Sequence, residues 1–219
     1  MIKKVGVLIQ ARLGSSRLPG KMLLPIHGLT LLERVALASS KIRADEYAIV
    51  CPESDVEVFS TIMRNTEYKV IGGSETNVVE RFVNAIVKLS LDVVVHITGD
   101  KPFLSAKYTQ ISLDHHLNCS CDLTTFEDHP LIGLTGAIYY PPILAKALNN
   151  PETTKYQLEH VKPCYTENPE CKHCKMPVPD HLKKITNFQY TIDNPSDYRK
   201  VLDIYKALYP KWPVEIDEI

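Results

Sequence analysis

Residues 8–21 read LIQARLGSSRLPGK, and they continue an apolar run, Val5–Ile9, that is typical of a buried strand. After this segment, four apolar residues have the spacing of one helix face: Leu31, Leu32, Val35 and Ala36. The polar part of the segment is therefore a loop at the C-terminal end of a first parallel strand, which is where open α/β sheets bind ligands. The stretch predicts an α/β fold with a binding loop after its first strand.

The chemistry of this loop suits a polyanion. It combines cations, glycines and hydroxyl groups: Arg12, Arg17 and Lys21; Gly14 and Gly20; Ser15 and Ser16. Cations neutralise phosphate charge, and glycine allows a close approach of the backbone or a positive φ. The loop has neither the P-loop pattern nor the dinucleotide-binding pattern. A solvated basic loop is the alternative, but three cations and two glycines behind a first strand favour a triphosphate cradle.

The order Q-A-R-x-G-S-S-R-L-P-G-K over residues 10–21 resembles the N-terminal signature of the cytidylyltransferases that make CMP-activated acidic sugars. The SpsF-like spore coat proteins are the nearest branch, with the CMP-Kdo synthetases as relatives. The resemblance follows most of the chain and is weakest over 105–155. It implies catalytic roles for Arg12, Arg17 and Lys21. It also implies nucleotide contacts from five loop residues: Gln10, Ala11, Gly14, Ser15 and Ser16.

Length and composition agree with one enzyme domain. The 219 residues suit a single domain over 1–219, and a formal net charge of −1 argues against a nucleic-acid partner. No apolar run reaches the roughly 18 residues that a membrane span needs. Because no cleavable signal peptide is visible, we expect a cytoplasmic protein without membrane partners.

Strand-like and helix-like segments alternate along the chain. Strands are predicted at 5–9, 47–51, 68–71, 92–97, 136–140 and 188–192. Helices are predicted at 30–41, 55–64 (with Ser54 as the N-cap), 78–89, 143–148 and 196–208. This alternation predicts a Rossmann-like, three-layer α/β fold with a mostly parallel sheet. The resemblance implies that it is a nucleotidyltransferase fold.

Acidic residues follow two of the predicted strands. Asp100 ends the segment Thr98-Gly99-Asp100, and by resemblance it is the carboxylate that binds catalytic Mg²⁺. Asp193 resembles the second acidic position of the family. Mg²⁺ prefers one or two carboxylates together with phosphate oxygens. Asp100 could instead cap the next turn, and Asp193 could cap the helix that Pro195 opens.

Two further segments match the family less specifically. The turn Gly72-Gly73-Ser74-Glu75, followed by Asn77 and Arg81, resembles the segment beside the nucleotide base, so Gly73 and Ser74 are candidate nucleotide-binding residues. An ordinary strand-to-helix turn with a Ser cap explains the same residue types. Glu159 and His160 resemble an E-H-V motif that lines the acceptor side of the cleft. A lone His also often has only a structural role.

Six cysteines in a chain of this length do not predict a disulfide framework. Cys164, Cys171 and Cys174 cluster within a candidate insertion at 160–178, with His160 upstream. Tetrahedral Zn²⁺ takes four nitrogen or sulfur ligands at such spacings. Two interpretations stay open: a structural zinc site, or three reduced thiols in a surface insertion.

The predicted reaction joins CTP to a small acidic acceptor, releases pyrophosphate and uses Mg²⁺. Lys101 is the nearest cation not assigned to phosphate, so we expect it to bind the acid group of the acceptor. The segment Phe126–Thr135 lacks the family's usual acidic pair, which leaves the identity of the acceptor open. The alternatives are an enzyme that uses another NTP or a phosphonate acceptor, and a catalytically inactive protein that binds a nucleotide sugar. By resemblance we expect a homodimer.

Overall fold

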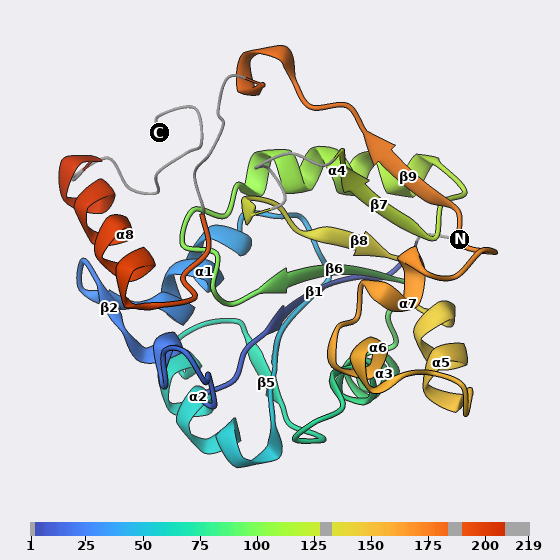
Figure 1. The fold of residues 1–219 in the computed structure, drawn as a ribbon, viewed down its shortest axis with the longest axis horizontal. Coiled ribbons are helices and arrows are strands. Elements are labelled where there is room, and N and C mark those ends of the chain that lie inside the picture. Colours follow the sequence, from blue (N-terminus) through green and yellow to red (C-terminus); the bar gives the residue numbers. More distant parts are fainter. Residues whose placement is uncertain (1–2, 128–132, 184–189, 209–219) are drawn as a thin grey trace.

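The computed structural model describes residues 3–127, 133–183 and 190–208. Its main sheet has seven strands in the order β5-β4-β1-β6-β8-β7-β9 (Figure 1). Their bounds are β1 Val5–Gln10, β4 Glu46–Val50, β5 Lys69–Ile71, β6 Val93–Thr98, β7 Leu123–Phe126, β8 Ala137–Tyr139 and β9 His173–Met176. The first four strands are parallel, whereas β8 runs antiparallel to both β6 and β7. The expected mostly parallel sheet is confirmed.

Helices cover both faces of this sheet and complete a three-layer fold. They are α1 Leu31–Ser39, α2 Val56–Met63, α3 Val78–Leu89, α4 Ala106–Asn118, α5 Pro142–Asn149, α6 Lys155–Glu159, α7 Pro163–Thr166 and α8 Pro195–Leu208. Because side chains alternate along a strand, Ile9 and Leu8 belong to the cores on opposite faces. The first core takes its helical residues from α1, α2, α4 and α8, and the second from α3, α5 and α7.

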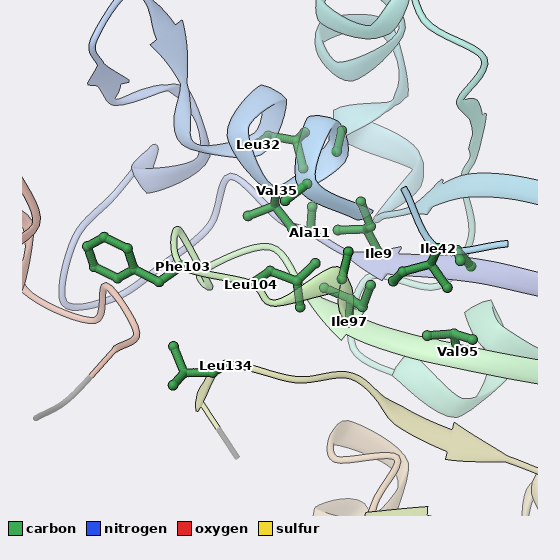
Figure 2. Close-up of a cluster of buried hydrophobic side chains, with 14 of the residues drawn as sticks. Ile9, Ala11, Leu32, Val35, Ile42, Val95, Ile97, Phe103, Leu104 and Leu134 are labelled. Atoms are coloured by element: carbon green, nitrogen blue, oxygen red, sulfur yellow. The ribbon is translucent and has the colours of Figure 1, made fainter. Parts of the chain in front are cut away.

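The core around β1 and β6 fixes the edge where the candidate site lies. In Figure 2 the side chains of Leu32 and Val35, from α1, gather with those of Ile9 and Ile97 from the two central strands. All four are fully buried, with 0% of each residue exposed. β1 is paired on both sides, so Val7 lies between Tyr47 of β4 and Val95 of β6. The loops that leave β1 and β6 therefore start from rigid elements.

Local capping explains where several helices begin. Thr30 forms a capping box with Glu33, which starts α1 close to the predicted position. Asn77 accepts a hydrogen bond from the Glu80 backbone N–H and starts α3. For helix α2, the predicted N-cap Ser54 is wrong, because Asp55 is the N-cap residue. The carboxylate of Asp55 instead binds the loop after β1.

The C-terminal half departs more from the sequence prediction. Helix α4 and strands β7 and β9 were not predicted, and β9 includes Cys174. Of the predicted strand 188–192, residues 188–189 lie outside the described residues, and 190–192 are not part of the sheet. A backbone hydrogen bond, from Ile192 N to Asp100 O at 2.9 Å, ties this segment to the end of β6.

A short antiparallel hairpin, β2 Pro25–Ile26 and β3 Leu29–Thr30, follows the binding loop. Within the described parts of the chain, no helix has both the length and the apolar character that crossing a membrane would require.

Candidate functional site

The loop after β1 is anchored by the backbone at both of its ends. Ala11 N donates to Val50 O at 3.1 Å, and Gly20 N donates to Leu13 O at 2.9 Å. Leu13 N donates to Oδ2 of Asp55 at 2.8 Å. Asp55 is only 7% exposed, so this carboxylate holds the loop from the neighbouring strand-to-helix connection. The start of the loop is thus fixed by the neighbouring strand β4 and by the carboxylate of Asp55.

Glycines have distinct roles at this edge of the sheet. Gly20 has a φ of 67°, a conformation that costs little only for glycine. A Cβ on Gly99 would lie 2.8 Å from Sδ of Met22 and 3.2 Å from the carbonyl oxygen of Gln10. A Cβ on Gly14 would meet no atom within 4 Å, so this glycine faces open space. That space leaves room for a ligand beside the loop.

Three predicted site residues meet at one point. Nζ of Lys21 lies 3.0 Å from Oδ2 of Asp100 and 3.3 Å from Oδ1 of Asp193. It also donates to the carbonyl oxygen of Ile192 at 2.8 Å. Lys21 is only 8% exposed, so its charge is compensated inside the fold rather than by water. Two carboxylates and one cation from distant parts of the chain form the centre of the site.

Arg17 extends this centre toward solvent. Its guanidinium lies 3.3 Å from Oδ1 of Asp193, and 68% of its side chain is exposed. An exposed pair of this kind contributes little to stability, so the guanidinium can be redirected to a ligand at small cost. The loop therefore presents one buried and one exposed cation at the same carboxylate.

Asp100 is held ionised. Burial on its own raises the pKa of its carboxyl group, but the charge of Lys21 and the hydroxyl of Thr98, which donates at 2.7 Å, outweigh burial and lower the pKa overall. Asp100 is therefore a carboxylate at neutral pH and can bind a cation.

The carboxylate of Asp193 is not used as a helix cap. Oδ1 of Asn194 accepts from the backbone N–H groups of Ser196 and Asp197, and Oδ2 of Asp197 accepts from the backbone N–H of Asp193. Asn194 thus supplies the cap at the start of α8. The side chain of Asp193 points instead to Lys21 and Arg17.

The turn before α3 is built around a buried arginine. Arg81 is 1% exposed, and its Nη1 donates to the carbonyl oxygens of Ser74 and Glu75. Its Nε has no partner within the described structure. Burial lowers the pKa of Arg81, and the charge of Arg12 acts in the same direction. The hydroxyl of Ser74 accepts from Asn77 N at 3.2 Å, so it stabilises the turn before α3, whereas the predicted Ser cap is wrong because Asn77 is the N-cap of the helix.

A cavity of about 150 Å³ lies between the ends of β6, β7 and β8. Lys101 and Lys162 line it, together with His96, Thr135 and Tyr139. Nζ of Lys101 donates to the carbonyl oxygen of Thr135 at 2.6 Å. Burial lowers the pKa of Lys101 to about 8, and the charge of Lys162 contributes in the same direction against the opposing effect of Asp100. Two lysines on one small cavity favour an anionic occupant.

His96, which sequence reasoning missed, lies in the wall of this cavity. Its Nε2 is 3.1 Å from Oε1 of Gln10, and its Nδ1 is 3.4 Å from the hydroxyl of Tyr139. Burial, followed by the charge of Lys101, lowers its pKa to about 3. His96 is therefore a neutral hydrogen-bonding residue that orients Gln10. A polar residue inside the apolar run of β6 was the signal that could have identified it.

Glu159 and His160 lie at the C-terminal end of α6, which approaches the loop after β1. Oε1 of Glu159 is 3.8 Å from Nη1 of Arg12, and both side chains are about half exposed, at 50% and 49%. The imidazole of His160 is exposed and packs beside the ring of Tyr156, with 4.7 Å between centroids. Only Glu159 of this pair contacts the cationic loop.

The predicted cysteine trio is not brought together. Cys164 is buried in the second core, and its thiol donates to the carbonyl oxygen of Gln157 at 3.4 Å; Cys171 packs against the same core. Cys174 instead lies with His115 and Cys119, and the ligand atoms of these three all lie within 4.8 Å of one another. This His/Cys/Cys group could hold a metal ion. The predicted zinc set Cys164, Cys171 and Cys174 is therefore wrong, because Cys174 lies on β9 next to the end of α4, apart from the other two cysteines.

Comparisons with known proteins agree with this fold. A family model described as cytidylyltransferase matches residues 6–211. The spore coat polysaccharide biosynthesis protein SpsF of Bacillus subtilis is 28% identical over 210 residues, which cover 93% of this chain and 85% of SpsF. A cytidylyltransferase structure from Leptospira borgpetersenii superposes with a TM-score of 0.83 at 26% identity, over 94% of this chain and 88% of that one.

A CMP:2-keto-3-deoxy-manno-octonic acid synthetase, solved in complex with CTP, superposes with a TM-score of 0.69 at 16% identity. The match covers 93% of this chain and 99% of the synthetase, and at this identity it concerns the fold.

Proposed function

This chain belongs to the cytidylyltransferase family, and from that premise we propose that it transfers the CMP group of CTP to a small acidic acceptor and releases pyrophosphate. The nucleotide is held at the loop after β1, and the acceptor enters from the cavity at the ends of β6, β7 and β8.

The observation that carries the proposal is the joint contact of Lys21 with Asp100 and Asp193, at 3.0 Å and 3.3 Å. These residues come from the loop after β1, the end of β6 and the start of α8. Such a centre at the C-terminal edge of parallel strands is where an α/β sheet binds its ligand. It combines a phosphate-binding cation with two carboxylates, which are the two kinds of group that nucleotidyl transfer requires.

The two carboxylates suit Mg²⁺. Asp100 and Asp193 supply hard oxygen donors that already converge on a single cation, the ammonium of Lys21. Mg²⁺ binds through one or two carboxylates together with phosphate oxygens. When bound, the ion stabilises the negative charge that develops on the phosphates during transfer. The two carboxylates carry more negative charge than the one ammonium of Lys21 neutralises. A divalent cation can therefore bind beside it.

The residues of the loop bind and orient the triphosphate. Lys21 and the two arginines, Arg12 and Arg17, compensate the charge of the β- and γ-phosphates and stabilise the departing pyrophosphate. An oxygen of the acceptor attacks the α-phosphorus in line, its bond to phosphorus forms, and the bond between the α-phosphorus and the bridging oxygen breaks. The acceptor loses one proton in this reaction. No nucleophile from the protein is required.

The other nucleotide contacts follow from the same placement. Gln10, Ala11 and Ser15 lie on the strand end and loop that approach the phosphates, together with Gly14 and Ser16. Gly73 and Ser74 lie beside buried Arg81 on the side assigned to the base and ribose.

Lys101 and Lys162 are the groups that bind the acid of the acceptor. Both line the cavity of about 150 Å³ next to Asp100, and a carboxylate gains charge-assisted hydrogen bonds from ammonium donors. Glu159, which lies near Arg12 of the loop, and the neighbouring His160 would contact the rest of the acceptor. We retain the homodimer as part of the proposal, to be checked by light scattering coupled to size-exclusion chromatography.

The decisive experiment measures pyrophosphate release from each of the four NTPs with Mg²⁺, against a panel of acceptors. The panel pairs carboxylated sugars, such as 3-deoxy-manno-octulosonate and N-acetylneuraminate, with neutral sugars and a phosphonate. Release from CTP with a carboxylated sugar, and not with the neutral ones, supports the proposal. A higher kcat/KM with another NTP or with the phosphonate would replace it. CTP binding without any turnover would indicate a binding protein.

A further inference from the structure

Four potential metal ligands converge at the opposite end of the sheet from Asp100. His115 and Cys119 lie at the C-terminal end of α4, where Cys119 is the C-cap residue. Cys121 follows in the short connection to β7, and Cys174 is the second residue of β9. In Figure 1, α4 lies next to β7 and β9, so these three chain segments are neighbours.

The side chains of these residues face one another. Nε2 of His115 is 3.1 Å from Sγ of Cys174. The ligand atoms of His115, Cys119 and Cys174 all lie within 4.8 Å of one another. Cys121 lies two residues after Cys119, and burial, followed by the neighbouring thiols of Cys119 and Cys174, raises the pKa of its thiol. The cluster therefore brings together one imidazole nitrogen and two sulfur atoms, and the neighbouring thiol of Cys121 is the candidate fourth ligand.

The chemistry of the donors selects the kind of ion. Three sulfurs and one imidazole match the Cys₃His set of tetrahedral structural zinc sites, whereas Mg²⁺ and Ca²⁺ require oxygen ligands. The thiol is a weak hydrogen-bond donor and acceptor, so three neutral thiols facing one another gain little from the contact. Zn²⁺ binding displaces a proton from each thiol and replaces these weak contacts by coordination.

We propose that His115, Cys119, Cys121 and Cys174 bind one structural Zn²⁺ ion that ties strand β9 to the end of α4. Four protein ligands close the coordination sphere, so the ion has a structural and not a catalytic role. Its position agrees with that role. Strand β7 runs in the same direction as β6, because both are antiparallel to β8. The start of β7 is thus at the edge opposite to Asp100.

The proposed ion would stabilise an edge strand of the sheet. β9 is the last strand of the sheet and pairs only with β7 among the described strands, over Leu123–Phe126 and His173–Met176. Its sequence, His-Cys-Lys-Met, has a weak tendency to form a strand. Lys172 N donates to Oδ2 of Asp122 at 2.9 Å, which fixes the start of this pairing. Zinc would add a cross-link from β9 to α4 beside that bond.

The test measures zinc in the full chain purified under reducing conditions without chelator, then equilibrated with zinc chloride and dialysed. We expect about one zinc per chain in the wild type. The variants Cys119→Ser and Cys121→Ser should lose most of it. The exposed ligand is tested by His115→Ala, which should weaken zinc retention without affecting the core. Cys171→Ser is the matched control and should keep the ion, since Cys171 lies outside the cluster.

Two measurements on the wild type keep the test independent of how the variants fold. Exchange with Co²⁺ should give the thiolate charge-transfer band and the intense visible bands of tetrahedral cobalt. Chelation should lower the unfolding temperature. The proposal is overturned if zinc is absent after supplementation, if Cys171→Ser and not Cys119→Ser loses the ion, or if thiol counting finds a disulfide among the three cysteines.

Discussion

The ammonium nitrogen of Lys21 lies 3.0 Å from Oδ2 of Asp100, although 79 residues separate them in the sequence. The pair joins the phosphate-binding loop to the end of β6, where the metal-binding carboxylate of the proposed reaction is placed. Lys21 keeps Asp100 ionised and in position, and the two carboxylates in turn compensate the charge of Lys21. The loop and the carboxylate are therefore one electrostatic unit, and replacing either partner should affect the other.

The variant Asp100→Asn tests this unit. The amide keeps the shape of the side chain but loses the charge that binds Mg²⁺ and pairs with Lys21. We expect kcat to fall at least about a hundredfold, while binding of CTP without metal is retained, as measured by calorimetry. Asp114→Asn is the matched control, because Asp114 pairs with Arg43 on an exposed part of α4. Retention of full Mg²⁺-dependent activity in Asp100→Asn would remove this residue from the metal site.

Arg17→Ala examines the exposed part of the cationic loop. With 68% of its side chain exposed, Arg17 contributes little to the fold, so its removal should leave the unfolding temperature nearly unchanged. Loss of a charge-assisted contact to phosphate should weaken CTP binding by about tenfold or more. Arg43→Ala, which removes an exposed arginine remote from the loop, should bind CTP like the wild type. Equal CTP affinity in all three proteins, measured by calorimetry, would place Arg17 outside the nucleotide site.

The sequence predicts those features that depend on local pattern. The apolar run of β1 and the polar loop behind it predicted a strand followed by a loop at the C-terminal edge of a parallel sheet, and the structure has both, because strand and loop position follow from the pattern alone. Helix α3 was predicted within its observed bounds, since its apolar residues repeat with the helical period and Asn77 caps it.

Features that depend on tertiary contacts were missed. Helix α4 carries few apolar residues and many polar ones, so its buried face is not obvious from periodicity. Strand β9 has a polar sequence and exists through its pairing with β7. For this reason Cys174 was grouped with its neighbours in sequence, Cys164 and Cys171, instead of with His115 and Cys119. Lys162 likewise reaches the cavity beside Lys101 only through the return of the chain after α6.

Lys101→Ala tests the acceptor cavity. If the ammonium of Lys101 binds the acid of the acceptor, the KM of the acceptor should rise about tenfold or more, while the KM of CTP stays nearly constant. Lys162→Ala should have a smaller effect in the same direction, and Lys146→Ala, on α5 and outside this cavity, serves as the control. An equal rise in both KM values would assign Lys101 to the phosphates.

The same residue predicts a pH dependence. Burial lowers the pKa of Lys101 to about 8, so the ammonium form is present below that pH and is lost above it. The KM of the acceptor should therefore rise as pH increases beyond about 8, by up to about tenfold per unit. The KM of CTP should not follow. In Lys101→Ala this rise should disappear. A rise that persists in the variant would have to come from another group.

His96 predicts how stability responds to acid. Burial lowers its pKa to about 3 in the folded protein, against an ordinary value of 6.5. Between these two values the unfolded chain binds a proton that the folded chain does not, so the free energy of unfolding falls as pH drops below 6.5. At pH 5 this contribution amounts to about 2 kcal/mol.

His96→Gln keeps a side chain that can bond Gln10 and Tyr139 and cannot titrate. Urea unfolding at pH 7 and pH 5 should therefore show a smaller loss of stability for this variant than for the wild type. His160→Gln, at an exposed position, should lose as much as the wild type. The same loss in His96→Gln as in the wild type would mean that folding does not lower the pKa of His96, and its role as a buried neutral partner of Gln10 would be wrong.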